Sequence, residues 1–187
     1  IGGGLRFDGV NDNVLIPNIN SNEMSFAAWV YKNANDTTNA DAIFGGQRWN
    51  SNVQLQEGYE LRFPPSSPNT IQFILVTKNA TGFRTVKTVS KNLVNSVSSW
   101  YHVAGVYNKT TGDQRLYING QLAGNQIHPV GNTIVPLTFY PDMRIGYSRN
   151  INGYFNGMID DVCFYNGVLS DQEVFDLYNV GGDNTAP

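Results

Sequence analysis

Apolar residues occur in short runs that are separated by polar turns along almost the whole chain. Met24 to Tyr31 is an eight-residue apolar run, too short and too closely flanked by asparagine for a buried helix. Trp100 to Tyr107 repeats this long pattern, so both runs predict central strands. Shorter strands are predicted at residues 5–7, 13–16, 42–46, 59–63, 70–77, 84–89, 143–146 and 157–165.

Turn-forming residues connect several of these strands. Asp8 to Asp12 separates the first two strand patterns, which therefore indicate an N-terminal hairpin-like unit that stops at Pro17. Asn119-Gly120 separates residues 114–118 from 121–123, and both of its residues tolerate the positive φ of a two-residue turn. We expect a β-hairpin there.

One short helix is predicted near the C-terminus. Ser170-Asp171-Gln172-Glu173 has the spacing of a capping box, Val174, Leu177 and Tyr178 share one helical face, and Gly181 follows as a stop. About a dozen strands with almost no helix predict an all-β sandwich of two packed antiparallel sheets.

Composition narrows the classes of partner. Charged residues make up 14% of the 187 residues and the net charge is -3, so no basic surplus exists to neutralise nucleic acid or an anionic membrane. No stretch approaches 18 apolar residues, which argues against membrane insertion. A single cysteine and two histidines exclude an internal disulfide and a Cys/His zinc site.

The length and the ending suggest one module of a larger protein. We expect residues 1–180 to form a single β-sandwich, because sandwiches of this size fold as one domain. Residues 181–187 are small, polar and end in proline, as linkers between extracellular modules do. The expected protein is a monomeric module of a multidomain chain that is secreted or displayed at the cell surface.

Four segments, in this order, resemble the laminin-G-like branch of the concanavalin A-like lectin/glucanase superfamily. They are Leu5-Arg6-Phe7-Asp8-Gly9-Val10-Asn11-Asp12, Phe26-Ala27-Ala28-Trp29-Val30, Trp100-Tyr101-His102-Val103-Ala104 with Leu116-Tyr117-Ile118-Asn119-Gly120, and Phe155 to Val162 with Leu169-Ser170. The resemblance implies a jelly roll with one concave and one convex sheet. Domains of this kind serve as carbohydrate-binding modules, adhesion modules or spacers, so it leaves the function open.

The resemblance also pairs the two ends of the chain and thereby implies a structural Ca²⁺. Carboxylate and amide oxygens from both ends would converge, and such oxygens are the ligands that Ca²⁺ takes. The alternative is that Asp8 caps its own turn and Asp160 accepts backbone hydrogen bonds. The predicted ligands are Asp8, Asn11, Asp12, Asp160 and Asp161.

A sugar site needs an aromatic platform surrounded by planar hydrogen-bonding groups. Gln47-Arg48-Trp49-Asn50 supplies all of these in one polar loop, where Trp49 is either an exposed sugar platform or a loop-packing residue. Tyr59, Arg62, Arg84 and Tyr147, with Arg149 and Tyr154, are candidates for the same surface or ordinary rim residues. If Arg48, Arg62 and Arg84 converge, they suit carboxylated or sulfated sugars.

Catalysis is not expected. The glucanases of the superfamily that the chain resembles carry closely spaced acids of the form Glu-x-Asp-x-Glu on one strand, and this chain has no such run. The nearest pair, Glu57 and Glu60, should point to opposite faces of a strand. The predicted function is a non-catalytic, glycan-binding module with a structural calcium ion; a protein-binding adhesion module or a spacer is the alternative.

Overall fold

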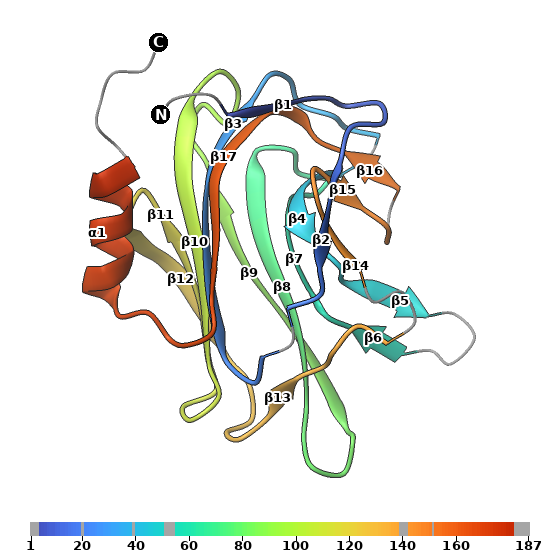
Figure 1. Ribbon diagram of the computed structural model, residues 1–187, viewed down its shortest axis with the longest axis vertical. Helices are drawn as coiled ribbons and strands as arrows, with labels where there is room; N and C mark the ends of the chain where they lie inside the picture. Colours follow the sequence, from blue (N-terminus) through green and yellow to red (C-terminus); the bar gives the residue numbers. More distant parts are fainter. Residues whose placement is uncertain are drawn as a thin grey trace.

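The computed structural model of the protein describes residues 4–19, 21–38, 40–50, 55–138, 142–150 and 152–181. Two large antiparallel sheets pack face to face, and one helix, α1 (Asp171–Gly181), lies outside them (Figure 1). This is the predicted jelly-roll sandwich with a short C-terminal helix. The predicted linker lies outside the described residues from residue 182 onward.

Sheet A contains six strands and sheet B contains seven. In spatial order, sheet A is β1 (Leu5–Asp8), β17 (Asn156–Tyr165), β3 (Met24–Lys32), β10 (Trp100–Asn108), β11 (Asp113–Ile118) and β12 (Gln121–Ile127). Sheet B is β13 (Thr133–Ile134), β8 (Thr70–Lys78), β7 (Tyr59–Phe63), β4 (Asp41–Gly45), β14 (Asp142–Ile145) and β2 (Val14–Pro17), with β9 (Arg84–Asn92) paired to β8.

Two small hairpins complete the strand set, and the sequence patterns did not predict either of them. They are β5 (Arg48–Asn50) with β6 (Leu55–Glu57), and β15 (Tyr147–Ser148) with β16 (Gly153–Tyr154). Strands of two or three residues are too short to show an alternating pattern, which is the signal that predicted the others.

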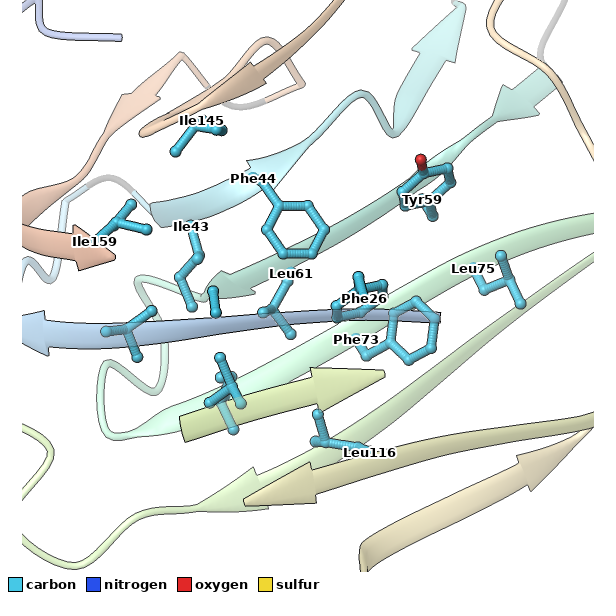
Figure 2. Close-up of a cluster of buried hydrophobic side chains, with 14 of the residues drawn as sticks. Phe26, Ile43, Phe44, Tyr59, Leu61, Phe73, Leu75, Leu116, Ile145 and Ile159 are labelled. Atoms are coloured by element: carbon cyan, nitrogen blue, oxygen red, sulfur yellow. The ribbon is translucent and has the colours of Figure 1, made fainter. Parts of the chain in front are cut away.

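The core lies between the sheets and is rich in aromatic rings (Figure 2). Phe26 of β3 meets Phe44 and Phe73 of sheet B edge to face, at centroid distances of 4.6 and 4.9 Å. Gly105 of β10 lies beneath the Phe26 ring, because a Cβ atom there would stand 2.1 Å from Cζ of that ring. The glycine in this apolar strand therefore makes room for the central phenylalanine.

Helix α1 covers the outer face of sheet A. Val174 packs with Ala27, Ala104 and Tyr117 in a second apolar cluster, and Tyr178 stacks on Trp29 at 5.7 Å. The capping box is formed as predicted: the Ser170 backbone N–H donates to the Glu173 carboxylate at 2.8 Å. Because the helix buries this face, β3 is apolar on both sides, and its sequence shows a continuous apolar run.

The hairpin between β11 and β12 is confirmed, whereas the N-terminal hairpin is not formed. Asn119 and Gly120 take φ values of 50° and 73° in the predicted turn. In contrast, β1 pairs with β17 in sheet A and β2 pairs with β14 in sheet B. The turn at residues 8–12 carries the chain from one sheet to the other, so the prediction of a paired unit was wrong.

Candidate functional site

The hairpin of β15 and β16 lies against the outer face of sheet B, beside β4. Glu60 lies between the core residues Tyr59 and Leu61 of β7, so its side chain points away from the core. The Ser148 hydroxyl donates to the Glu60 carboxylate at 2.8 Å, which attaches the hairpin to the sheet. The backbone N–H of Gly146 also donates to the carbonyl of Ile43 in β4 at 2.9 Å.

Glu60 is fully buried beneath this hairpin, and Arg62 is its cationic partner. The Arg62 Nη1 donates to Glu60 Oε1 at 3.2 Å, and its Nε lies 3.5 Å from Gln72 Oε1. Burial raises the pKa of Glu60 to about 7, although Arg62 and the Ser148 hydrogen bond both oppose the rise. The sequence did not single out Glu60 for this site.

Two tyrosines pair across the hairpin. Tyr147 and Tyr154 are opposite each other in the register; both are half-buried, and their ring centroids lie 4.5 Å apart. The Tyr147 hydroxyl donates to the Asn152 side-chain carbonyl at 3.0 Å, and the Arg144 guanidinium lies 5.9 Å from the Tyr147 ring. An aromatic surface with amide and guanidinium groups beside it can stack on the apolar face of a sugar and bond its hydroxyls.

The loop that the sequence favoured lies next to this hairpin. Asn150, in the β15–β16 turn, donates its side-chain N–H to the Gln47 side-chain carbonyl at 2.9 Å. Gln47 directly precedes β5, the strand that contains Trp49, so β5 starts next to the β15–β16 hairpin. The side chains of Arg48, Trp49 and Asn50 lie outside the described part of the chain.

We call the resulting surface the hairpin site. Its side chains come from three separate parts of the chain and are joined by the contacts above. The members are Arg62, Tyr147, Asn150 and Tyr154, together with Gln47, which is buried and accepts the hydrogen bond from Asn150. Asn150 was missed by the sequence analysis; the Asn152-Gly153 turn between the two tyrosines was the signal that could have revealed the hairpin.

Two of the sequence-predicted residues lie elsewhere. Tyr59 is a core residue, 2% exposed, whose hydroxyl donates to the Met143 sulfur at 3.1 Å. Arg84 bonds the backbone carbonyl of Gln56 and lies 3.9 Å from the Glu57 carboxylate.

Two of the three arginines that the sequence proposes for an anionic sugar have described side chains, Arg62 and Arg84, and these two do not converge on one spot. Arg62 is level with Gln72 on β8 and Arg84 is level with Lys78, so their backbones lie about 20 Å apart along the strands. Each also has a carboxylate partner within the protein. A shared arginine pocket for one anionic group therefore cannot include both Arg62 and Arg84, because strand register separates them.

The predicted calcium ligands divide into two groups. The chain ends do pair, as expected, but Asp8 stands opposite Asn156 whereas Asp160 lies one residue beyond the Leu5–Ile159 pair. This register separates Asp8 from Asp160 by about 13 Å. No group of three or more acids, histidines or cysteines suited to a metal lies within the described ranges.

The local contacts of these acids match the alternative derived from the sequence. Asp8 Oδ1 accepts from the backbone N–H groups of Val10 and Asn11, at 2.8 and 3.3 Å, and these bonds lower its pKa. Asp160 Oδ1 accepts from the N–H of Asp161 at 2.9 Å. Asp161 has φ +48° where the register with β3 shifts, so this bulge places Ile159 and Val162 both toward the core.

The two glutamates nearest the site serve as structural anchors. Glu57 accepts from the backbone N–H and the hydroxyl of Thr138, at 2.9 and 2.7 Å. Glu60 is held by Arg62 and Ser148, and Gly58, with φ +74°, lies at the break between β6 and β7. The pair therefore belongs to different strands and different networks.

The two packed antiparallel sheets define a jelly-roll β-sandwich. The chain belongs to the concanavalin A-like lectin/glucanases superfamily: a laminin G-like family model with that description matches residues 8–175. Human pentraxin-related protein PTX3 is 26% identical in an alignment 161 residues long that covers 80% of this chain and 38% of PTX3. The chain thus spans little more than a third of that relative's length.

Solved structures share the fold at low sequence identity. A carbohydrate-binding module, CBM40, of a Ruminococcus gnavus sialidase bound to α2,3-sialyllactose has a TM-score of 0.69 and 13% identity, covering 94% of this chain and all of that one. The binding domain of botulinum neurotoxin serotype D has a TM-score of 0.66 and 19% identity, and the match covers 94% of this chain and 41% of that one. A pentraxin from Limulus polyphemus has a TM-score of 0.62 and 16% identity, and the match covers 96% of this chain and 83% of that one.

Proposed function

We propose that this protein is a non-catalytic, extracellular module that binds glycans through the hairpin site. The observation that carries the proposal is the half-buried pair Tyr147 and Tyr154, each partly accessible, on a hairpin that is bonded to the sheet through Ser148 and Glu60. A preorganised aromatic surface loses little conformational freedom when a sugar stacks on it. The sialyllactose-bound relative by fold supports a carbohydrate ligand.

The absence of catalysis is part of this proposal. Hydrolysis of a glycosidic bond requires two carboxyl groups that flank the bond, one of them free to act on it. Glu57 and Glu60 are occupied by Thr138, Arg84, Arg62 and Ser148 instead.

Among the residues that the structure describes, no helix has the length and apolar composition needed to span a membrane.

The test is a glycan array and affinity-gel screen of the domain against neutral, carboxylated and sulfated polysaccharides. Tyr147→Ala and Tyr154→Ala should each weaken binding by about tenfold, because each removes an aromatic stacking surface. Trp49→Ala tests the separate sequence prediction that Trp49 is a sugar platform, which a loss of binding would support. Phe83→Ala is the matched control, since Phe83 is an exposed aromatic, 72% accessible, on the β8–β9 turn.

The controls separate this proposal from its rivals. Equal loss of binding in Phe83→Ala and the tyrosine variants would contradict the hairpin site. A folded domain that binds none of the glycans would contradict the whole proposal and would favour a protein-binding adhesion module or a spacer.

We also propose a structural Ca²⁺ at the turn between β1 and β2. This keeps the N-terminal ligands of the sequence prediction and leaves out Asp160 and Asp161, which the strand register places away from Asp8. Asp8 and Asp12 share this turn, and the backbone N–H of Asp8 donates to Asp12 Oδ2 at 3.0 Å. Each carboxylate has a second oxygen that these bonds do not use, and Ca²⁺ completes its shell with backbone carbonyls and water. The role would be to hold the turn that passes from sheet A to sheet B.

A further inference from the structure

A cavity of about 270 Å³ is lined by residues of β13 and of the end of β8. Figure 1 shows β13 at the end of sheet B that is far from the hairpin of β15 and β16. The walls of the cavity are the connection from β2 to β3, the end of β8, and residues 133–137 in and after β13. None of the five residues of the hairpin site lines it. The volume is close to the lower end of ligand pockets, about 300 Å³, and suits one small ligand rather than a long chain.

The cavity is held open by backbone hydrogen bonds. The N–H of Gly58 donates to the carbonyl of Val135 at 2.9 Å, and the N–H of Val135 donates to the carbonyl of Val76 at 2.9 Å. The Asn18 side chain donates to the carbonyl of Leu137 at 3.3 Å. Gly58 has φ +74°, and a Cβ atom there would stand 2.7 Å from Leu137, so glycine keeps this wall in place.

The lining of the cavity combines one positive charge with neutral hydrogen-bonding groups. Lys78 is half-buried, and within the described ranges it makes no ion pair with a carboxylate. The described lining contains no acidic residue, so Lys78 gives the cavity a formal charge of +1. Asn18, Ser21 and Asn22 add amide and hydroxyl groups.

The lining also contains apolar residues. Ile19 and Pro136 line the same cavity, together with Leu137. A ligand complementary to this lining carries one carboxylate for the lysine, several hydroxyls for the amides, and an apolar face for the isoleucine and proline. A neutral ligand would leave the half-buried ammonium without a partner, and an apolar one would leave the amides unpaired.

We propose that this cavity binds a sugar acid, with its carboxylate on Lys78. This second site rests on the cavity and its lysine alone, so it can exist whether or not the hairpin site binds glycans. A free sugar acid and the terminal acidic residue of a chain share this recognition chemistry, and the test below distinguishes them.

The test is a titration of ¹⁵N-labelled protein followed by amide NMR, with methyl glucuronide as the probe and methyl glucoside as its neutral counterpart. Methyl glucuronide should shift the amides of Ser21, Lys78 and Thr133 and bind at least about tenfold more tightly than the glucoside. A glucuronate-terminated oligosaccharide in a second arm shows whether a chain end is accepted.

Two variants and a control assign the effect to the cavity. Lys78→Met should remove the preference for the acid, and Asn22→Trp should block the rim and abolish binding of both probes. Lys91→Met, on the exposed end of β9, should change neither. Thermal unfolding of each variant verifies that it is folded.

The outcomes separate the two sites. Equal affinity for the acid and the neutral sugar, or an unchanged preference in Lys78→Met, would overturn the sugar-acid proposal. Shifts confined to Tyr147, Asn150 and Tyr154 would overturn it as well, while supporting the hairpin site. Shifts confined to the cavity would support it and leave the hairpin site without a ligand.

Discussion

At the scale of single residues, the site depends on a buried carboxyl group whose ionisation costs stability. The pKa of Glu60 rises from 4.5 to about 7 because burial disfavours the charged form. Between these two values the folded protein holds a proton that the unfolded chain releases. The contribution of Glu60 to the free energy of unfolding should therefore fall as the pH rises from about 4.5 to 7, by up to about 3 kcal/mol.

Glu60→Gln should remove this dependence. The difference in unfolding free energy between Glu60→Gln and the parent protein should grow in favour of the variant as the pH rises through that window. Urea denaturation at a series of pH values measures it. His102 and His128, whose pKa values burial lowers to about 4, act in the opposite direction, but they are common to both proteins and cancel.

A matched control tests the assignment to Glu60. Glu23→Gln replaces a glutamate at the β2–β3 connection, outside the hairpin network. It should leave the pH profile of the parent protein unchanged. A flat difference between Glu60→Gln and the parent across this range would contradict the role given to the Glu60 carboxyl group.

At the scale of elements, one glycine allows the β15–β16 hairpin to fold back onto sheet B. Gly146 has φ +80°, and a Cβ atom there would stand 2.3 Å from the Phe7 ring. That ring packs against Phe155 at 6.2 Å, so it is held between the hairpin and the core. The glycine is thus required both by its backbone conformation and by the lack of space.

Gly146→Ala should destabilise the protein by more than about 2 kcal/mol, since it combines a strained φ with a clash against Phe7. Gly82→Ala is the control, because Gly82 has φ +87° and no atom within 4 Å of the added Cβ. Gly82→Ala should lower the free energy of unfolding by about 1 kcal/mol, from the strained φ alone. Equal losses in the two variants, measured by urea denaturation, would show that the clash is absent.

At the scale of the whole molecule, the proposed Ca²⁺ would link the two sheets through the turn at residues 8–12. Binding to the folded state alone raises the melting temperature. We expect Ca²⁺ to raise it by several degrees over a chelator, and Asp12→Asn to reduce the effect. Asp161→Asn, far along β17 from this turn, should retain it. The same melting temperature with Ca²⁺ and with a chelator would contradict the proposal.

The sequence by itself predicted the two-sheet architecture, the principal strands and the capped helix, because each has a local signal. Met24 to Tyr31 shows this, since burial on both faces leaves a continuous apolar run. The sequence also singled out Tyr147, Arg62 and Gln47 as candidates, from residue type and their place at strand ends or in loops.

Only the tertiary structure decided which of these candidates meet. Strand register separates Arg62 from Arg84 and Asp8 from Asp160, and no local pattern reports register between strands far apart in sequence. Likewise, Ser148 meets Glu60, and Asn150 meets Gln47, through contacts across about ninety residues or more. The fold follows from local periodicity, whereas the site follows from how the sheets align.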